Sequence, residues 1–222
     1  MKWGHFFTSA IGKKFVMGFT GFFLITFLIV HCTINACIYV PDHGQTFLKT
    51  AHFMGTNWIV HVLEVGLIVG FFLHIIQGLM LTVQNRSKRP KKYAVNRVSQ
   101  TTTWYSRSMG LLGTLILIFL IIHWANFWIP NRYNQITHGE ELNLFERMKM
   151  VFSNGWIVII YLLGVLSLSF HLLHGFQSAF RTFGLSSKRY IPIVKGIGTA
   201  FSIIVPLIFA SMPVLMYFGV VK

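Results

Sequence analysis

Acidic residues are few in this sequence: it contains five Asp and Glu against nineteen Lys and Arg, in 222 residues. Charged residues of both signs make up only 11%, whereas apolar residues make up 54%. A soluble domain carries about a quarter charged residues, because its surface must be solvated. The scarcity of charge therefore excludes an ordinary soluble protein and favours an integral membrane protein.

Cysteine is scarce as well. The only two are Cys32 and Cys37, and residues five apart do not share a helix face, so we expect no disulfide between them. The sequence shows neither a flavin-binding motif nor cysteines spaced to hold an iron–sulfur cluster. Flavin and iron–sulfur chemistry are therefore not expected in this chain.

Long apolar runs fill the sequence instead. About 20 helical residues cross a hydrocarbon core about 30 Å thick. Pro41 and Pro130 lie just beyond two of the runs, where helices are expected to end. Pro206 and Pro213 fall inside the last run and should bend it. We predict an all-α integral membrane protein with a single transmembrane domain over 1–222, whose first four spans form a bundle; the five spans are 14–39, 58–83, 106–129, 155–180 and 194–218.

Lys and Arg are distributed unevenly between the loops. Fourteen of the nineteen lie in the N-terminal segment, in 84–107 and in 181–195. Because cytoplasmic loops carry the excess of basic residues, the N-terminus is predicted in the cytoplasm and the C-terminus outside, in a multi-pass protein of a bacterial cytoplasmic membrane. The positive charge follows this topology, so no nucleic-acid partner is expected. The basic loop would contact membrane lipid headgroups or dock a peripheral partner.

One apolar motif occurs twice. Met109–His123 (MGLLGTLILIFLIIH) matches Met17–His31 (MGFTGFFLITFLIVH) at seven of fifteen positions, including the final histidine. The second and fourth spans contain His74 and His171, each with a glycine four residues later. A histidine inside a bilayer is costly, and its repetition in related helices indicates a shared role.

The four histidines fall at two depths. At 1.5 Å per residue, His31 and His123 lie about 14 and 10 Å from the outer face, and His74 and His171 about 24 Å from it. This predicts an outer pair, His31 with His123, and an inner pair, His74 with His171. Two haems, each ligated by one pair within a four-helix core, fit this arrangement.

Two other features near these histidines need an interpretation. His61 lies 13 residues from His74, a spacing seen in the cytochrome b of quinol–cytochrome c reductases. No other span repeats that spacing, so His61 is left out of the ligand set. Glycines flank the ligands, and they allow either close approach of a flat macrocycle or ordinary helix packing; they are Gly18, Gly21, Gly78, Gly110, Gly113 and Gly175.

Three segments resemble a known family. Residues 9–14 (SAIGKK), followed by 17–21 (MGFTG), are similar to the opening of the di-haem cytochrome b subunit of succinate:quinone oxidoreductases, the cytochrome b558 type. Residues 106–113 (SRSMGLLG) resemble that family's third-helix entry, and 170–175 (FHLLHG) its fourth-helix ligand motif. The resemblance extends over nearly the whole chain. His174 stands where the family usually has another residue.

The resemblance implies the membrane anchor of a succinate dehydrogenase or fumarate reductase. Such an anchor holds two haems b, and a flavoprotein and an iron–sulfur subunit bind its cytoplasmic face and carry out the dicarboxylate chemistry. Electrons would pass between the iron–sulfur subunit, the two haems and a quinone, usually menaquinone. By motif position the iron ligands would be His31, His74, His123 and His171.

Several polar residues remain as candidates. Glu64 is the only acid within a span and lies one turn from His61, so the two could form a quinone site or an outer proton path, or simply hydrogen-bond to each other. Basic residues at the cytoplasmic helix ends could pair with propionates of the inner haem, although positive-inside bias explains them equally well. These candidates are Lys13, Lys14, Arg107, Arg181 and His174.

The segment 137–151 interleaves acidic and apolar residues, which predicts a short amphipathic helix on the outer surface. Two alternatives to the anchor remain. One is a haem b subunit of another respiratory oxidoreductase, such as a hydrogenase or formate dehydrogenase. The other is a haem-free proton-coupled transporter, which would show midplane breaks in paired helices. The absence of proline from the four histidine-bearing spans disfavours the transporter.

Overall fold

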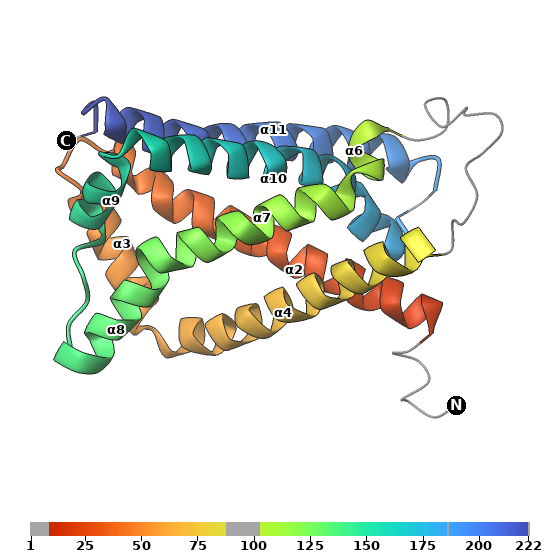
Figure 1. The fold of residues 1–222 in the computed structure, drawn as a ribbon, viewed down its shortest axis with the longest axis horizontal. Coiled ribbons are helices and arrows are strands. Elements are labelled where there is room, and N and C mark those ends of the chain that lie inside the picture. The colour runs from red at the N-terminus through yellow and green to blue at the C-terminus, as the bar shows by residue number, and fades with distance from the viewer. Residues whose placement is uncertain (1–8, 88–102, 186, 222) are drawn as a thin grey trace.

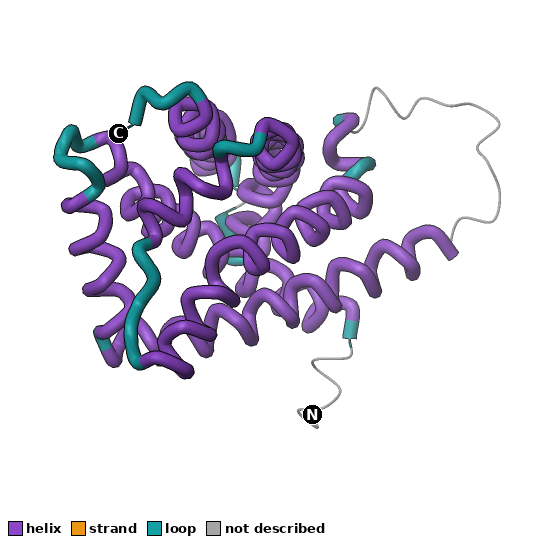
Figure 2. Tube along the Cα trace, turned by 60° about the vertical axis from the view of Figure 1, so that its left-hand side comes forward, coloured by secondary structure: helices purple, strands orange, loops and turns teal. Residues whose placement is uncertain are grey.

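The computed structural model describes residues 9–87, 103–185 and 187–221, and over these residues the regular structure is entirely helical (Figures 1 and 2). The elements, in chain order, are α2 (Ala10–Ala36), η1 (Cys37–Tyr39), α3 (Gln45–Thr56), α4 (Trp58–Ser87), α6 (Trp104–Arg107), α7 (Met109–His123), η2 (Trp124–Trp128), α8 (Ile129–His138), α9 (Leu144–Phe152), α10 (Gly155–Thr182) and α11 (Tyr190–Tyr217).

Five helical stretches in the described ranges are long and apolar enough to cross a membrane. This confirms the all-α membrane class and the number of spans. The stretches are Ile11–Tyr39, Trp58–Asn85, Met109–His138, Gly155–Thr182 and Tyr190–Tyr217.

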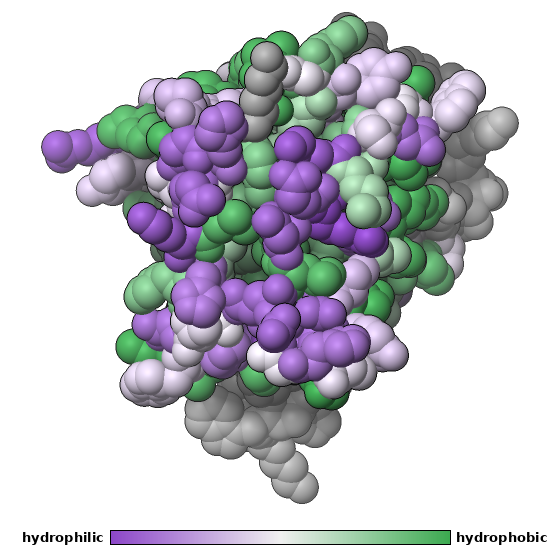
Figure 3. Space-filling view, turned by 90° about the vertical axis from the view of Figure 1, so that its left-hand side faces the viewer, coloured by the Kyte–Doolittle hydropathy of each residue, from purple (hydrophilic) through white to green (hydrophobic). Residues whose placement is uncertain are grey.

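The first four spanning stretches form a bundle. α2 packs against α4 and α10, and α7 packs against the same two helices. α2 and α7 therefore stand at opposite corners, as do α4 and α10. α11 lies outside this square, along α10 (Figure 1). The short helices α3, α8 and α9 gather at one end of the bundle, where hydrophilic residues are concentrated (Figure 3). We call this end the capped end.

Pro130 does not end the third span, contrary to the sequence prediction. The helix continues through the π-helical turn η2 and through α8 as far as His138. Proline cannot donate to the carbonyl four residues earlier, which is that of Asn126. Arg147 Nε of α9 donates to this carbonyl at 2.8 Å instead. The helix ends at Gly139, whose φ of 72° is left-handed.

Pro206 creates the same deficit inside α11. The carbonyl four residues earlier belongs to Ser202, whose side chain is fully buried. Ser169 Oγ of α10 donates to that carbonyl at 2.7 Å. A neighbouring helix therefore supplies the hydrogen bond that the proline cannot, which allows α11 to run unbroken from Tyr190 to Tyr217.

The predicted amphipathic helix begins later than expected. α9 starts at Leu144 rather than at 137, because the left-handed Gly139 ends α8 and Asn143 caps the next helix by accepting from the Glu146 amide at 3.0 Å. α9 is amphipathic as predicted, and one of its faces packs into a core together with α3 and η1. The buried residues of that face are Phe145, Met148 and Phe152.

Candidate cofactor site

The outer pair of histidines meets across the bundle. His31 of α2 and His123 of α7 have ring centroids 5.9 Å apart. Each ring stacks on the phenylalanine one turn earlier in its own helix: Phe27 lies 5.1 Å from His31, and Phe119 lies 5.7 Å from His123. These phenylalanines occupy the same position of the repeated motif, so both halves of the chain hold their histidine in the same way.

The inner pair meets in the same manner from the other two corners. His74 of α4 and His171 of α10 have ring centroids 6.3 Å apart. A Cβ built on Gly21 would lie 3.6 Å from His74 Cε1, and one built on Gly113 would lie 3.8 Å from His171 Cε1. Gly21 and Gly113 are again equivalent in the repeat. The structure thus brings together the predicted partners of both pairs.

The flanking glycines divide into two kinds. A Cβ on Gly18 would come within 2.8 Å of Thr182, and one on Gly110 within 2.6 Å of Thr82, so these two glycines are required by helix packing. Gly21 and Gly113 leave room for an ordinary contact with the adjacent imidazole. Helix packing alone does not require a glycine there, so these two positions fit a flat group held beside the histidines.

The spacing of each pair suits a shared metal ion. An imidazole nitrogen lies about 2 Å from the metal it binds, so two imidazoles on opposite sides have ring centroids about 6 Å apart. Each pair offers only two ligands, and within 9–87, 103–185 and 187–221 no group of three or more His, Cys, Asp or Glu could surround an ion. A haem iron needs only two, because the macrocycle occupies its other coordination positions.

The hydrogen bonds made by these imidazoles, in the part of the chain that is described, involve Nδ1. His74 Nδ1 lies 3.1 Å from Thr20 Oγ1, whose own proton goes to the Val16 carbonyl at 2.8 Å, so the imidazole is the donor. His31 Nδ1 lies 3.3 Å from the Asn35 amide nitrogen. A proton fixed on Nδ1 of His74 leaves Nε2 available to a metal.

The other member of each pair lacks such a partner. The Nδ1 atoms of His123 and His171 are buried and accept or donate no hydrogen bond among the described residues. At the inner pair the reason is visible in the repeat: the position equivalent to Thr20 is Leu112, which is 4% exposed and has no polar atom in its side chain. The two halves of the chain therefore place their histidines alike, but the hydrogen bonds at the Nδ1 atoms of these histidines differ between them.

Glu64 is held by Trp128 and Arg132, two residues that no pattern in the sequence connects with it, and lies beside His61, as its spacing predicts. Its Oε1 accepts from Trp128 Nε1 at 2.8 Å, and its Oε2 pairs with Arg132. His61 Nδ1 lies 3.5 Å from the same Oε2. Arg132 also donates to Gln135 at 2.8 Å. The only signal in the sequence was that Arg132 is a rare cation on the side of the membrane that carries most of the acids.

The candidates for the inner propionates lie at the end of the bundle opposite the capped end. Lys13 and Lys14 belong to the first turns of α2, Arg107 ends α6 and Arg181 lies in the last turn of α10. His174 is half-buried, one turn beyond His171. A residue missed from the sequence is Gln77, one turn from His74, whose buried Nε2 has no partner within the described ranges. Most of the basic loop at 84–107 lies outside the described residues.

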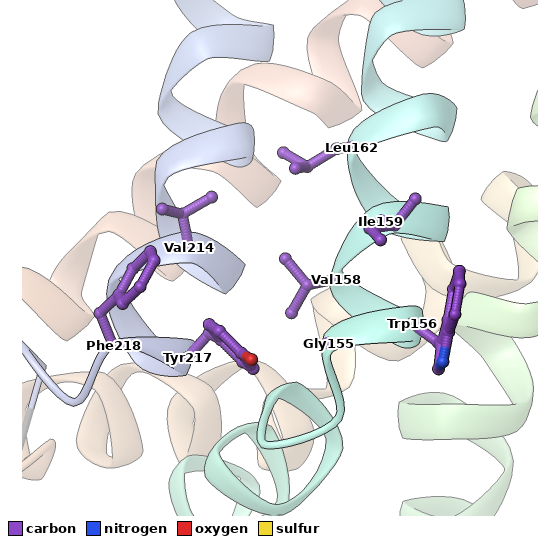
Figure 4. A pocket seen from close by; sticks show the side chains of 8 residues that line it. All are labelled: Gly155, Trp156, Val158, Ile159, Leu162, Val214, Tyr217 and Phe218. Carbon is purple, nitrogen blue, oxygen red and sulfur yellow. The ribbon is translucent and has the colours of Figure 1, made fainter.

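A groove of about 510 Å³ opens between α10 and α11 near the capped end (Figure 4). None of the four histidines lines it, and apart from the Tyr217 hydroxyl and the Trp156 indole its lining side chains are aliphatic or phenyl. We therefore assign no chemistry to it. Its lining residues are Gly155, Trp156, Val158, Ile159, Leu162, Val214, Tyr217 and Phe218.

The fold and the site together define an all-α membrane protein whose five-span bundle brings two pairs of histidines together at two depths. The chain is 26% identical over 161 residues to the succinate dehydrogenase cytochrome b558 subunit of Bacillus subtilis (strain 168), which covers 72% of this chain and 73% of that protein. This similarity confirms the resemblance found in the sequence. No family model matches the chain, and no solved structure matches it.

Proposed function

We propose that this chain is the di-haem cytochrome b membrane subunit of a succinate:quinone oxidoreductase. The observation that supports it best is the pair of facing histidines at each of two levels, contributed by opposite helices. The similarity to a succinate dehydrogenase cytochrome subunit supports the wider assignment to that complex. In this proposal His31 and His123 ligate the outer haem b, and His74 and His171 ligate the inner one.

The chain's residues would set the state of two one-electron carriers. A haem supplies an iron that alternates between ferric and ferrous, and two histidines per iron leave no position open to oxygen. Phe27 and Phe119 fix the ring planes of the outer ligands. Thr20 would fix the tautomer of His74.

Electrons would pass between a cytoplasmic iron–sulfur subunit, the inner pair, the outer pair and a membrane quinone, for which we propose menaquinone. The flavoprotein and iron–sulfur subunits would bind the basic cytoplasmic face, with the N-terminus on that side and the C-terminus outside. Quinol oxidation releases two protons with its two electrons. We propose Glu64 and His61 as their acceptors, held in place by Arg132 and Trp128. Normal quinol turnover in E64Q would contradict this role.

The deciding experiment is a dithionite-reduced minus oxidised spectrum of the purified protein, with haem counted per polypeptide. We expect two low-spin b haems, and about one in H31A or H123A, because each iron loses a ligand. H138A is the matched control, since His138 is exposed at the end of α8 and should leave both haems in place. A preparation from the native membrane that contains no haem would contradict the proposal and favour the transporter alternative.

The identity of the co-purifying subunits tests the other alternative. A flavoprotein and an iron–sulfur protein with succinate dehydrogenase or fumarate reductase activity would support the anchor. Co-purification with a hydrogenase or formate dehydrogenase would be compatible with the haem ligation but would contradict the assignment to a succinate:quinone oxidoreductase.

A further inference from the structure

Arg147 on α9 is a half-buried cation that has no acidic partner among the described residues. Two other cations of the capped end are neutralised: Arg132 pairs with Glu64, and Lys149 Nζ lies 3.0 Å from Glu146 Oε1. Arg147 makes one strong hydrogen bond, from Nε to the Asn126 carbonyl, and its Nη1 is 4.0 Å from Met150 Sδ. No carboxylate of the described residues lies within ion-pair distance of its guanidinium. Its two Nη groups therefore remain able to bind an anion.

The position of Arg147 is tied to the outer histidine pair. Arg147 donates to the carbonyl of Asn126, and Asn126 is three residues beyond His123 in the same continuous helix. The amide of Asn126 donates to Tyr161 Oη at 3.0 Å. Tyr161 is 5% exposed, and its ring centroid lies 6.0 Å from that of His123. Two hydrogen bonds, through Asn126, thus connect the Arg147 guanidinium to Tyr161, whose ring lies beside that of His123.

The hydrogen-bond donors of Arg147 and Tyr161 that have no acceptor among the described residues suit a carboxylate. With Nε occupied, the two Nη groups of Arg147 can still present hydrogens to an anion. The Tyr161 hydroxyl accepts from Asn126, so its own proton remains available to a further acceptor. A partly buried guanidinium is stabilised when an anion hydrogen-bonds to it, and the described part of this region provides no such anion.

We propose that Arg147, with Tyr161 beside it, binds a propionate carboxylate of the outer haem. The inference rests on the proposed function, which supplies a haem between His31 and His123. It assigns the outer haem an anchor on the short surface helix α9, in addition to its two axial ligands. A phosphate of a lipid headgroup has the same anionic chemistry, and the experiment below separates the two sources.

The test is the midpoint potential of each haem in R147Q, measured in the intact complex. Glutamine can still donate to the Asn126 carbonyl but lacks the charge, so the structural hydrogen bond is retained. Without the cation the ferric state of the outer haem gains stability. The ratio of oxidised to reduced outer haem at fixed potential should rise about tenfold, which lowers its midpoint by about 59 mV. The inner haem should stay unchanged.

K149Q is the matched control, because Lys149 lies two residues away on α9 and Glu146 already compensates its charge. Its haem potentials should equal those of the wild type. The outer haem is identified as the one lost in H31A. An unchanged outer potential in R147Q, with or without loss of bound anionic lipid, overturns the inference while leaving the di-haem assignment intact. Absence of both haems from the wild-type protein would instead overturn the proposed function.

If the complex does not assemble with R147Q, the R147K variant tests the same inference by infrared spectroscopy. Haem labelled with ¹³C in its propionate carboxyls gives a carboxylate band in the redox infrared difference spectrum. Lysine keeps the charge but not the guanidinium geometry, so a propionate bound by Arg147 must change its band in R147K and not in K149R. A band identical in R147K and the wild type overturns the inference.

Discussion

Replacing Thr20 by valine removes a hydroxyl from the inner ligand pair at almost constant volume. In the structure this hydroxyl accepts from His74 Nδ1 at 3.1 Å and is held by the Val16 carbonyl. A ligand histidine that donates a hydrogen bond is a more basic ligand and favours the ferric iron. T20V should therefore raise the midpoint potential of the inner haem.

The size of the shift follows from the hydrogen bond. A neutral bond of this kind contributes about 1 kcal/mol. If most of it acts on the ferric state, the potential rises by about 40 mV, given that a tenfold change corresponds to about 59 mV for one electron. A redox titration that follows each α-band measures this directly.

Thr26 provides the control for T20V. It lies on the same helix and also donates to the carbonyl four residues earlier, at 3.2 Å, but its side chain is exposed. T26V should leave both potentials unchanged. A T20V protein with two haems and an unshifted inner potential would refute the argument that Thr20 polarises the ligand. A shift confined to the outer haem would refute the placement of His74 in the inner pair.

Three further substitutions test other parts of the structure. G113V should remove most of the inner haem and spare the outer one, because the side chain would occupy the space beside His171 that we assign to the macrocycle; haem counting measures it. S169A leaves the Ser202 carbonyl without its donor and should cost about 1–3 kcal/mol, seen as a lower thermal midpoint in detergent. D42N should remove a stabilisation of the start of α3, since the Thr46 hydroxyl and amide lower the pKa of Asp42 below 3.8. This stabilisation is present above pH 3.8 and is lost as the pH falls through the lower folded-state pKa, so amide exchange in α3 should match that of D42N only in acid.

Each of these has an outcome that would count against it. Equal loss of inner haem in G66V would show a general effect of valine, because Gly66 has no neighbour within 4 Å in the described structure. An unchanged unfolding midpoint in S169A would mean that another donor reaches the Ser202 carbonyl. Faster α3 exchange in D42N at acid pH as well as at neutral pH would remove the carboxylate from the explanation.

The sequence predicts the number of spans and which histidines lie at the same depth. Apolar runs defined the helices, and the repeated motif placed His31 and His123 at one depth and His74 and His171 at another. Both inferences depend on local periodicity and on helix rise, which a single chain displays directly. In the described residues the structure has five spans, and it brings the two rings of each pair together edge to face, with centroids 5.9 and 6.3 Å apart.

What the sequence did not provide depends on contacts between distant segments. Pro130 is predicted to end a helix, but the helix continues through it. The hydrogen bond from Arg147 to the Asn126 carbonyl, which compensates for the proline, joins residues 21 apart and leaves no local pattern. The pairing of Glu64 with Arg132 joins residues 68 apart and leaves no local pattern. Thr20 lies within the repeated motif, but its role emerges only when α4 places a histidine beside it.

The replacement of intrahelical by interhelical hydrogen bonds at Pro130 has a consequence for biosynthesis. In the third span Pro130 cannot donate to the Asn126 carbonyl, and the donor that reaches this carbonyl, Arg147, is a residue made later. That span is therefore completed only after α9 has been synthesised and has folded back onto it. At Pro206 the order is the reverse, because the donor, Ser169 of the fourth span, is made before the Ser202 carbonyl of the fifth span that it satisfies. Each of these two prolines thus makes a spanning helix depend on a neighbouring segment for one hydrogen bond, so neither helix has all its carbonyls satisfied until the bundle has packed.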